Sequence, residues 1–88
     1  MANKYGVKAA EEYLLAGNRI TRLEAIVLFA VPDLTKIISD LRRDGHEIAR
    51  GPTPLADVLQ RVNAAARLVP PTALPVHEIT LTEYWVRH

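Results

Sequence analysis

The stretch from Ile20 to His46 constrains the fold most, because it combines a helix-start signal, an internal proline and a closing glycine. Thr21 and Glu24 have the spacing of a capping box, in which each side chain satisfies a backbone N–H at a helix start. Pro32 cannot lie inside a continuous helix, because it lacks an N–H and clashes with the preceding turn. Gly45 suits the left-handed position that follows a helix end. We therefore predict a helix at 22–29, a turn at 29–32 and a second helix at 33–44.

The second helix of this pair has three faces of different chemistry. At about 100° per residue, positions i, i+3, i+4 and i+7 share one side of a helix. The apolar face consists of Leu34, Ile37, Ile38 and Leu41. A polar and basic face consists of Thr35, Lys36, Ser39, Arg42 and Arg43, and a separate acidic face consists of Asp33, Asp40 and Asp44. We predict that the apolar face is buried in the core.

The first helix of the pair is apolar on nearly every side over 23–30, which predicts a short helix enclosed by others. A buried helix, a short turn and a helix with an exposed polar-basic face together form the layout of a DNA recognition unit. An ordinary helical hairpin with a solvated charged face explains the same layout equally well. The pattern alone leaves both interpretations open.

The stretch also resembles the small helix-turn-helix domain of many bacteriophage and prophage proteins. The matching positions are Ile20-Thr21, Glu24-Ala25, Phe29, Leu41-Arg42 and Gly45-His46, in register without a gap, with Tyr13-Leu14 and Gly17 upstream. Such domains are winged helix-turn-helix modules that usually bind DNA, so the resemblance implies this fold and function. The chain departs from the pattern at Ala30, where Gly is common, and at Asp33 and Ile37, where basic residues are common. Helix 33–44 consequently carries equal numbers of acids and bases, which weakens phosphate binding.

Periodicity and turn residues place the remaining elements. We expect an N-terminal helix at about 4–16, a strand at 46–50 ended by Gly51-Pro52, and a returning strand at about 76–87 that pairs with it. Between the strands, apolar residues at helical spacing predict an inserted helix at about 54–68. The predicted fold is mainly α with a small β-hairpin: a winged helix-turn-helix with an extra helix inserted in the wing. We expect one domain over residues 1–88, with its helix-turn-helix core at 20–46.

Composition and spacing give no support for catalysis. The chain has no cysteine, which excludes disulfides, thiolate catalysis and Cys-ligated zinc. Its histidines, His46, His77 and His88, lack metal-site spacing, and the sequence contains no phosphate-binding glycine loop or nucleophile elbow. We therefore expect no enzymatic activity, no metal and no cofactor. No apolar run reaches membrane-spanning length, and we expect a protein of the host-cell cytoplasm without a membrane partner.

Three features have more than one interpretation. Tyr84 and Trp85 either stack on bases or anchor a partner, or else one faces the core and the other covers the sheet. The apolar stripe of the inserted helix either closes over the domain's own core or pairs with a second copy, and we predict a homodimer through Leu59. Arg19 lies either near a phosphate or in solvent.

These observations favour a protein that binds double-stranded DNA in transcriptional control, and the resemblance implies a phage or prophage setting. In this interpretation Thr35, Lys36, Ser39 and Arg43 enter the major groove, while Arg22, Arg42 and Arg50 hold the backbone. The alternative is a phage protein-binding factor on the same fold that inhibits a host complex, either a defence system, as an anti-CRISPR protein does, or a regulatory complex. The neutral helix 33–44, the inserted helix and a net charge of only +1 keep this alternative open.

Overall fold

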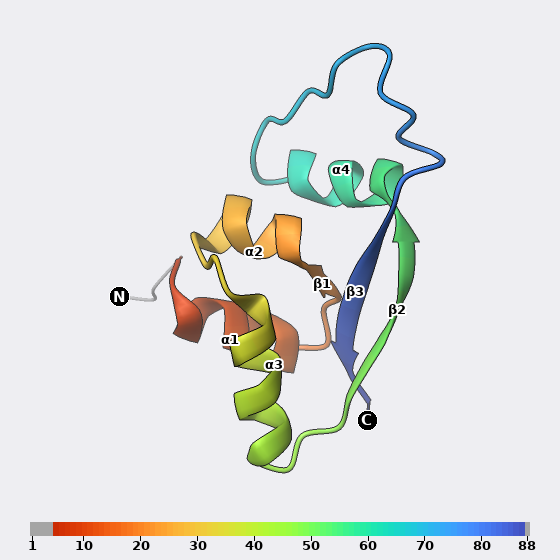
Figure 1. Ribbon diagram of the computed structural model, residues 1–88. Helices are drawn as coiled ribbons and strands as arrows, with labels where there is room; N and C mark the ends of the chain where they lie inside the picture. Colours follow the sequence, from red (N-terminus) through yellow and green to blue (C-terminus); the bar gives the residue numbers. More distant parts are fainter. Residues whose placement is uncertain (1–4, 88) are drawn as a thin grey trace.

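The computed structural model describes residues 5–87, which form four α-helices and a three-stranded antiparallel sheet. The helices are α1 (Val7–Leu15), α2 (Arg22–Phe29), α3 (Leu34–Arg43) and α4 (Leu55–Asn63), and the strands are β1 (Ile20–Thr21), β2 (Ile48–Pro54) and β3 (Thr80–Val86). Helices α1 to α3 lie to one side of the sheet, and α4 lies at the end of β2 (Figure 1). The predicted fold class is confirmed: β2 and β3 form a small hairpin, with α4 inserted between them. We call β2, α4, β3 and the segment 64–79 the wing. The N-terminal helix, predicted to begin at about residue 4, begins later, at Val7, because Gly6 with φ 94° is its N-cap. Residue 4 itself lies outside the described residues.

The predicted capping box is present at the start of α2. Thr21 Oγ1 accepts a hydrogen bond from the Glu24 backbone N at 3.3 Å, and Glu24 Oε1 accepts one from the Thr21 N at 3.1 Å. The helix ends at Phe29, and the next residue, Ala30, has a left-handed backbone with φ 56° and ψ 35°. The Val31 N then donates to the Ala25 carbonyl at 2.8 Å, which reverses the chain in the predicted turn.

α3 begins at Leu34, one residue later than predicted, because Asp33 serves as its N-cap. The Asp33 carboxylate accepts a hydrogen bond from the Lys36 backbone N at 3.3 Å. Pro32 therefore lies in the connection before the cap. At the other end, Gly45 has the predicted left-handed φ, 98°.

The predicted apolar face of α3 is part of the core. Its four residues, Leu34, Ile37, Ile38 and Leu41, are each at most 4% exposed. They belong to one cluster with buried residues of α1, α2 and the sheet. The prediction that α2 lies between other helices is confirmed, but the expectation that it does not lie at the surface was wrong, since Ile26 is 53% exposed and Val27 is 38% exposed. α1 and α4 pack against α2, and its outward side is left uncovered by the residues that the structure describes.

The sheet has one strand more than the predicted hairpin. β1 pairs with β3, whose other neighbour is β2, so the strand order is β1-β3-β2. The prediction that β2 ends at Gly51-Pro52 was wrong, because β2 continues to Pro54. The Arg87 N donates to the Glu47 carbonyl at 2.8 Å, so this opposed pair is hydrogen-bonded. Hydrogen-bonded pairs alternate along an antiparallel ladder, so the odd-numbered residues of β2 bond to β3. Pro52 and Pro54 lie at the positions between these, where the backbone nitrogen points away from β3. A proline there removes no hydrogen bond of the sheet.

The inserted helix and the returning strand are both shorter than predicted. α4 ends at Asn63 rather than near residue 68, because Asn63 Oδ1 accepts a hydrogen bond from the Leu68 N at 2.7 Å and turns the chain. β3 begins at Thr80 rather than 76, because the preceding segment caps α4. The carbonyls of Val76 and Ile79 accept hydrogen bonds from the first two N–H groups of α4, at 3.0 and 2.8 Å.

Candidate nucleic-acid interface

The polar-basic face of α3 is exposed, but its members differ in what they contact. All five residues, Thr35, Lys36, Ser39, Arg42 and Arg43, are exposed. Arg42 donates from Nη2 to the Ile48 carbonyl at 2.9 Å, which fastens the end of α3 to the start of β2. Arg43 lies 3.5 Å from Asp40 in an ion pair on the surface. Two of the three basic residues of this face therefore already have a partner within the protein.

Asp33 places a negative charge beside the same face. Its carboxylate accepts hydrogen bonds from the Thr35 hydroxyl at 2.7 Å and from the Lys36 backbone N at 3.3 Å. These two bonds lower the pKa of Asp33 below its usual value, so the group is ionised at neutral pH. The side chains of Lys36 and Ser39 make no hydrogen bond within residues 5–87. They are the members of the face that are available to a ligand without first breaking a contact.

Two adjoining cavities lie between the first turns of α2 and α3 and the wing. The first, of about 190 Å³, is lined by Arg22, Leu23, Thr35, Leu81, Thr82 and Tyr84. The second, of about 320 Å³, shares the last three of these residues and adds Arg50, Gly51, Pro52 and Thr80. We call this continuous hollow the groove. Two arginines and four hydroxyl-bearing side chains line it, and no acidic residue does so among the residues described.

The register of the sheet explains how these residues come together. Because side chains alternate between the faces of a strand, Thr80, Thr82 and Tyr84 share one face of β3. Arg50 is paired directly with Tyr84 on the neighbouring strand. β1 ends where α2 begins, so the outer part of β3 has Arg22 and Thr35 beside it in place of a third strand. The groove is the space that the short first strand leaves open.

The structure brings three of the seven predicted contact residues to the groove, namely Arg22, Thr35 and Arg50. The other four lie along α3, and Lys36 lines a separate cavity of about 250 Å³ with Val7 of α1. Sequence reasoning missed Thr82 and Tyr84 as members of a polar hollow. Their two-residue spacing within a predicted strand was a signal for a shared face, but the neighbours across that face were not visible in the sequence.

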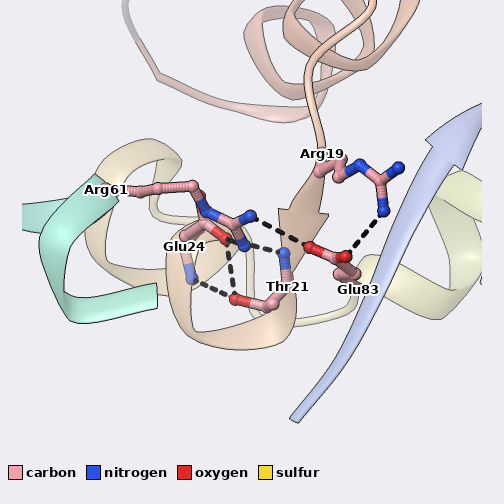
Figure 2. A network of polar contacts seen from close by, with 5 residues as sticks. All are labelled: Arg19, Thr21, Glu24, Arg61 and Glu83. Atoms are coloured by element: carbon pink, nitrogen blue, oxygen red, sulfur yellow. Dashed lines mark hydrogen bonds and ion pairs between the residues drawn. The ribbon is translucent and has the colours of Figure 1, made fainter. Parts of the chain in front are cut away.

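The opposite face of the sheet carries a network of charged side chains, which Figure 2 shows. Arg61 of α4 donates from Nη2 to Glu24 Oε1 at 2.7 Å and from Nη1 to Glu83 Oε1 at 2.9 Å. Arg19 donates to Glu83 Oε2 at 2.8 Å, and the Thr21 hydroxyl donates to Glu24 Oε1 at 3.0 Å. We call these five residues the ion network. It fastens the inserted helix to both α2 and β3.

Burial distinguishes the ion network from surface ion pairs. Glu24 is fully buried and Glu83 is 7% exposed. Burial by itself raises the pKa of Glu83, but hydrogen bonds from Arg61 and Arg19 hold it below its usual value. Burial likewise lowers the pKa of Arg61, and its bonds to the two carboxylates raise it above the usual value instead. Among the described residues, Glu24 Oε2 and Arg61 Nε are buried without a hydrogen-bond partner. The other polar atoms of these carboxylate and guanidinium groups bond mainly to one another.

The two aromatic residues of β3 lie on opposite faces of the sheet. Tyr84 packs partly against the core and lines the groove. The Trp85 ring lies 4.1 Å from the Arg19 guanidinium carbon on the other face. A Cβ added to Gly51 would come within 3.2 Å of the Trp85 ring. The absence of a side chain at Gly51 therefore allows the indole to pack against β2. This arrangement supports the interpretation in which one aromatic residue faces the core and the other covers the sheet.

The apolar stripe of α4 closes over the protein's own interior. Val58 and Val62 are fully buried and Leu59 is 8% exposed. Leu59 is therefore mostly covered within a single chain, although it lines an apolar cavity together with Leu55 of the same helix. The homodimer stays a prediction.

Within residues 5–87, no cluster of three acidic or histidine side chains is placed to hold a metal ion. No helix of the same part of the chain is both long and apolar enough to cross a bilayer. A family model described as a winged helix-turn-helix domain matches residues 11–66, which run from α1 to just beyond α4. No curated protein and no solved structure shows a significant match to the chain.

Proposed function

Because the chain belongs to the winged helix-turn-helix domain family, we propose that it binds double-stranded DNA with sequence preference and that α3 is its recognition helix. One observation carries this proposal. The exposed polar-basic face of α3 adjoins the groove through Thr35, which belongs to both, so side chains suited to bases and side chains suited to phosphates form one continuous surface.

The side chains of this surface divide into two roles by chemistry. Lys36, Ser39 and Arg43 lie on α3 and carry donors that suit the edges of bases in the major groove. Arg22 and Arg50 have no ion pair or side-chain hydrogen bond within residues 5–87, and they line the groove from opposite ends. An arginine without an internal partner is suited to hold a phosphate.

The neutral charge of segment 33–44, which is α3 with its two capping residues, is compatible with this division. Asp33 caps the helix and Asp40 lies beside Arg43, so both acids have local roles in the fold. Attraction to the phosphates then rests mainly on Arg22 and Arg50, which belong to α2 and β2 rather than to α3. We therefore expect modest, salt-sensitive affinity and a preference that depends on α3.

The test removes the two basic side chains of α3 that face the bases in this proposal. Lys36→Ala and Arg43→Ala, singly and together, are compared with the unmodified protein on a duplex selected from a random pool and on random duplex. A bidentate contact with guanine contributes about 1 to 3 kcal/mol of discrimination. The double variant should therefore lose most of its preference for the selected duplex, as measured by fluorescence anisotropy.

Arg67→Ala is a matched control, because it removes one positive charge from segment 64–79, at the end of the molecule far from α3 in Figure 1. This variant should keep the preference. Equal preference in the double variant and the unmodified protein would show that α3 does not read the sequence. Absence of salt-dependent binding to any duplex would remove the proposal altogether.

We further propose that the protein acts as a transcriptional regulator in a phage or prophage setting, in the cytoplasm where the host chromosome lies. The resemblance of residues 20–46 to phage and prophage helix-turn-helix domains supports this setting. A promoter-reporter assay with the selected duplex placed across a promoter tests it, and the expected result is a change in expression that the double α3 variant does not cause.

A second candidate function is protein binding, and the exposed apolar side of α2 favours it. Ile26 and Val27 are exposed there, and an apolar cavity of about 310 Å³ lies nearby between Leu23 of α2 and Leu55 of α4. Exposed apolar surface of this kind often marks an interface. The candidate gains support if Ile26→Asp and Val27→Asp abolish function in cells while leaving duplex binding unchanged.

A further inference from the structure

We infer that the groove holds the sugar-phosphate backbone of one strand of duplex DNA, and that the hydroxyls of Tyr84 and Thr82 donate hydrogen bonds to it between Arg22 and Arg50. This inference rests on the proposed function and adds two uncharged contact residues and a path for the strand. Neither residue belongs to α3.

The first argument is that the donors along the groove are unoccupied. The side chains of Arg22, Arg50, Thr82 and Tyr84 make no hydrogen bond or ion pair within residues 5–87. In the same part of the chain, Arg19, Arg42 and Arg61 are all engaged with carbonyl or carboxylate oxygens. The groove therefore collects polar groups that the fold itself does not use.

The second argument concerns the kind of donors present. A hydroxyl supplies one donor, and a guanidinium supplies several, while neither arginine nor a neutral hydroxyl repels an anion. Thr35 is an exception, because its hydroxyl proton is already given to Asp33 at 2.7 Å. The ionised Asp33 carboxylate repels phosphate at that end of the groove. A strand is consequently directed towards β3, where Tyr84 and Thr82 lie.

The third argument is the spacing along β3. Tyr84 and Thr82 are two residues apart on one face, a separation of about 7 Å along a strand. This backbone separation exceeds the size of one phosphate group, so the two side chains leave β3 at different points along an extended chain. Arg50, paired directly with Tyr84, continues this row on β2, and Arg22 lines the other side. An extended anionic polymer fits such a row better than a single small anion does.

The fourth argument is the separation of charge across the sheet. Glu83 lies between Thr82 and Tyr84 in the sequence, but strand alternation turns it to the opposite face, where Arg19 and Arg61 neutralise it. The groove side is thus free of carboxylates along β3. The charged and hydroxyl-bearing side chains that line the groove beside β3 are therefore arginines, threonines and a tyrosine, without a carboxylate.

The experiment removes single hydroxyls and keeps the shape of each side chain. Tyr84→Phe and Thr82→Val are measured against the selected duplex and against random duplex at several salt concentrations. Each variant should weaken binding to both duplexes alike, by about tenfold, which corresponds to about 1.4 kcal/mol. The dependence on salt should stay as in the unmodified protein, because no charge is removed, whereas Arg22→Gln should lower the salt slope by about one.

Tyr5→Phe and Thr72→Val are matched controls, because they remove the same hydroxyls at exposed positions that do not line the groove. Both should bind like the unmodified protein. If Tyr84→Phe lowers the melting temperature, Thr82→Val decides the matter, since Thr82 is exposed and its side chain has no internal hydrogen bond among the described residues.

The outcomes separate this inference from the proposed function. Unchanged binding of Tyr84→Phe and Thr82→Val, together with lost preference in the α3 double variant, overturns the strand path and leaves α3 as the recognition helix. Weakened binding that is confined to the selected duplex also overturns it, because a backbone contact acts on all sequences. Failure of the unmodified protein to bind any duplex removes the proposed function first.

Discussion

The two faces of the small sheet use arginine in opposite ways. On one face, Arg61 and Arg19 are bound to the carboxylates of Glu24 and Glu83 at 2.7 to 2.9 Å. On the other face, Arg22 and Arg50 line a groove and have no such partner among the described residues. The paired arginines are therefore expected to contribute to stability, and the unpaired ones to binding.

This difference follows from where each carboxylate lies. A buried carboxylate is costly unless a charged donor satisfies it, so Glu24 and Glu83 require their arginines. The groove has no carboxylate among its described lining residues, and its arginines keep their charge exposed to solvent. On one face the arginine charges are neutralised by carboxylates of the protein itself. On the other face the arginine charges are available to an anionic ligand.

The largest expected effect comes from breaking the ion network at its centre. Arg61→Met keeps much of the apolar volume but leaves Glu24 buried without its cationic partner. Removal of one member of a buried ion pair costs about 3 to 5 kcal/mol, so the free energy of unfolding in urea should fall by about this amount. This is a large share of the stability of a small domain.

The double variant Glu24→Gln with Arg61→Met is the matched control, because it leaves no buried charge alone. It should recover part of the lost stability. Arg67→Met, in segment 64–79, should stay within about 0.5 kcal/mol of the unmodified protein. If Arg61→Met also stays that close, the network does not hold the wing.

An intermediate loss of stability is expected when the Glu83 charge is removed, either by substitution or by lowering the pH. At neutral pH, Glu83→Gln should cost about 1 to 3 kcal/mol, because the hydrogen bonds from Arg61 and Arg19 lose a charged acceptor. The folded-state pKa of Glu83 lies below its ordinary value of 4.5, so its contribution is complete above that value and is lost as the pH falls through the folded pKa.

Urea unfolding at a series of pH values checks this prediction. The difference in stability between the unmodified protein and Glu83→Gln should shrink as the pH falls below 4.5. Glu12→Gln, at an exposed position of α1, should follow the unmodified protein throughout. A difference that stays constant with pH would mean that the Glu83 charge contributes nothing.

The sequence predicted the local parts of this architecture well. The capping box, the left-handed Gly45 and the apolar face of α3 depend on residues within a few positions of each other, and each is present. The turn at Ala30 was also placed correctly, although its left-handed backbone is unusual for a residue other than glycine. Short-range geometry was sufficient for all of these features.

Long-range contacts account for what the sequence could not predict. The start of β3 depends on the segment before it, whose carbonyls accept hydrogen bonds from Leu55 and Ala56, more than a dozen residues earlier in the chain. Strand β1 has only two residues, which is too short for a periodic pattern. The contact between Arg61 and Glu24 joins residues 37 positions apart, and that between Arg19 and Glu83 joins residues 64 apart. Pairing at such distances appears only in the folded chain.

Arg19 and Arg22 show this limit most clearly, since they flank the two residues of β1 and carry the same charge. Arg19 bonds to Glu83 at 2.8 Å and lies over Trp85, whereas Arg22 lines the groove. Nothing in the local sequence distinguishes their roles. Arg19 precedes β1 and Arg22 is already the first residue of α2, so the two side chains lie on different sides of the sheet.

The smallest and sharpest test therefore compares Arg19→Gln with Arg22→Gln, which remove the same charge three positions apart. Arg19 is half exposed, so its loss should lower the free energy of unfolding by only about 0.5 to 1 kcal/mol. Arg22→Gln should change stability by less than about 0.5 kcal/mol, yet weaken binding to every duplex and reduce the salt slope by about one. Arg19→Gln should leave that slope unchanged, because its charge is already neutralised by Glu83. Because the two variants have equal net charge, a general electrostatic effect would weaken binding equally in both, and that result would remove the distinction between the two faces of the sheet.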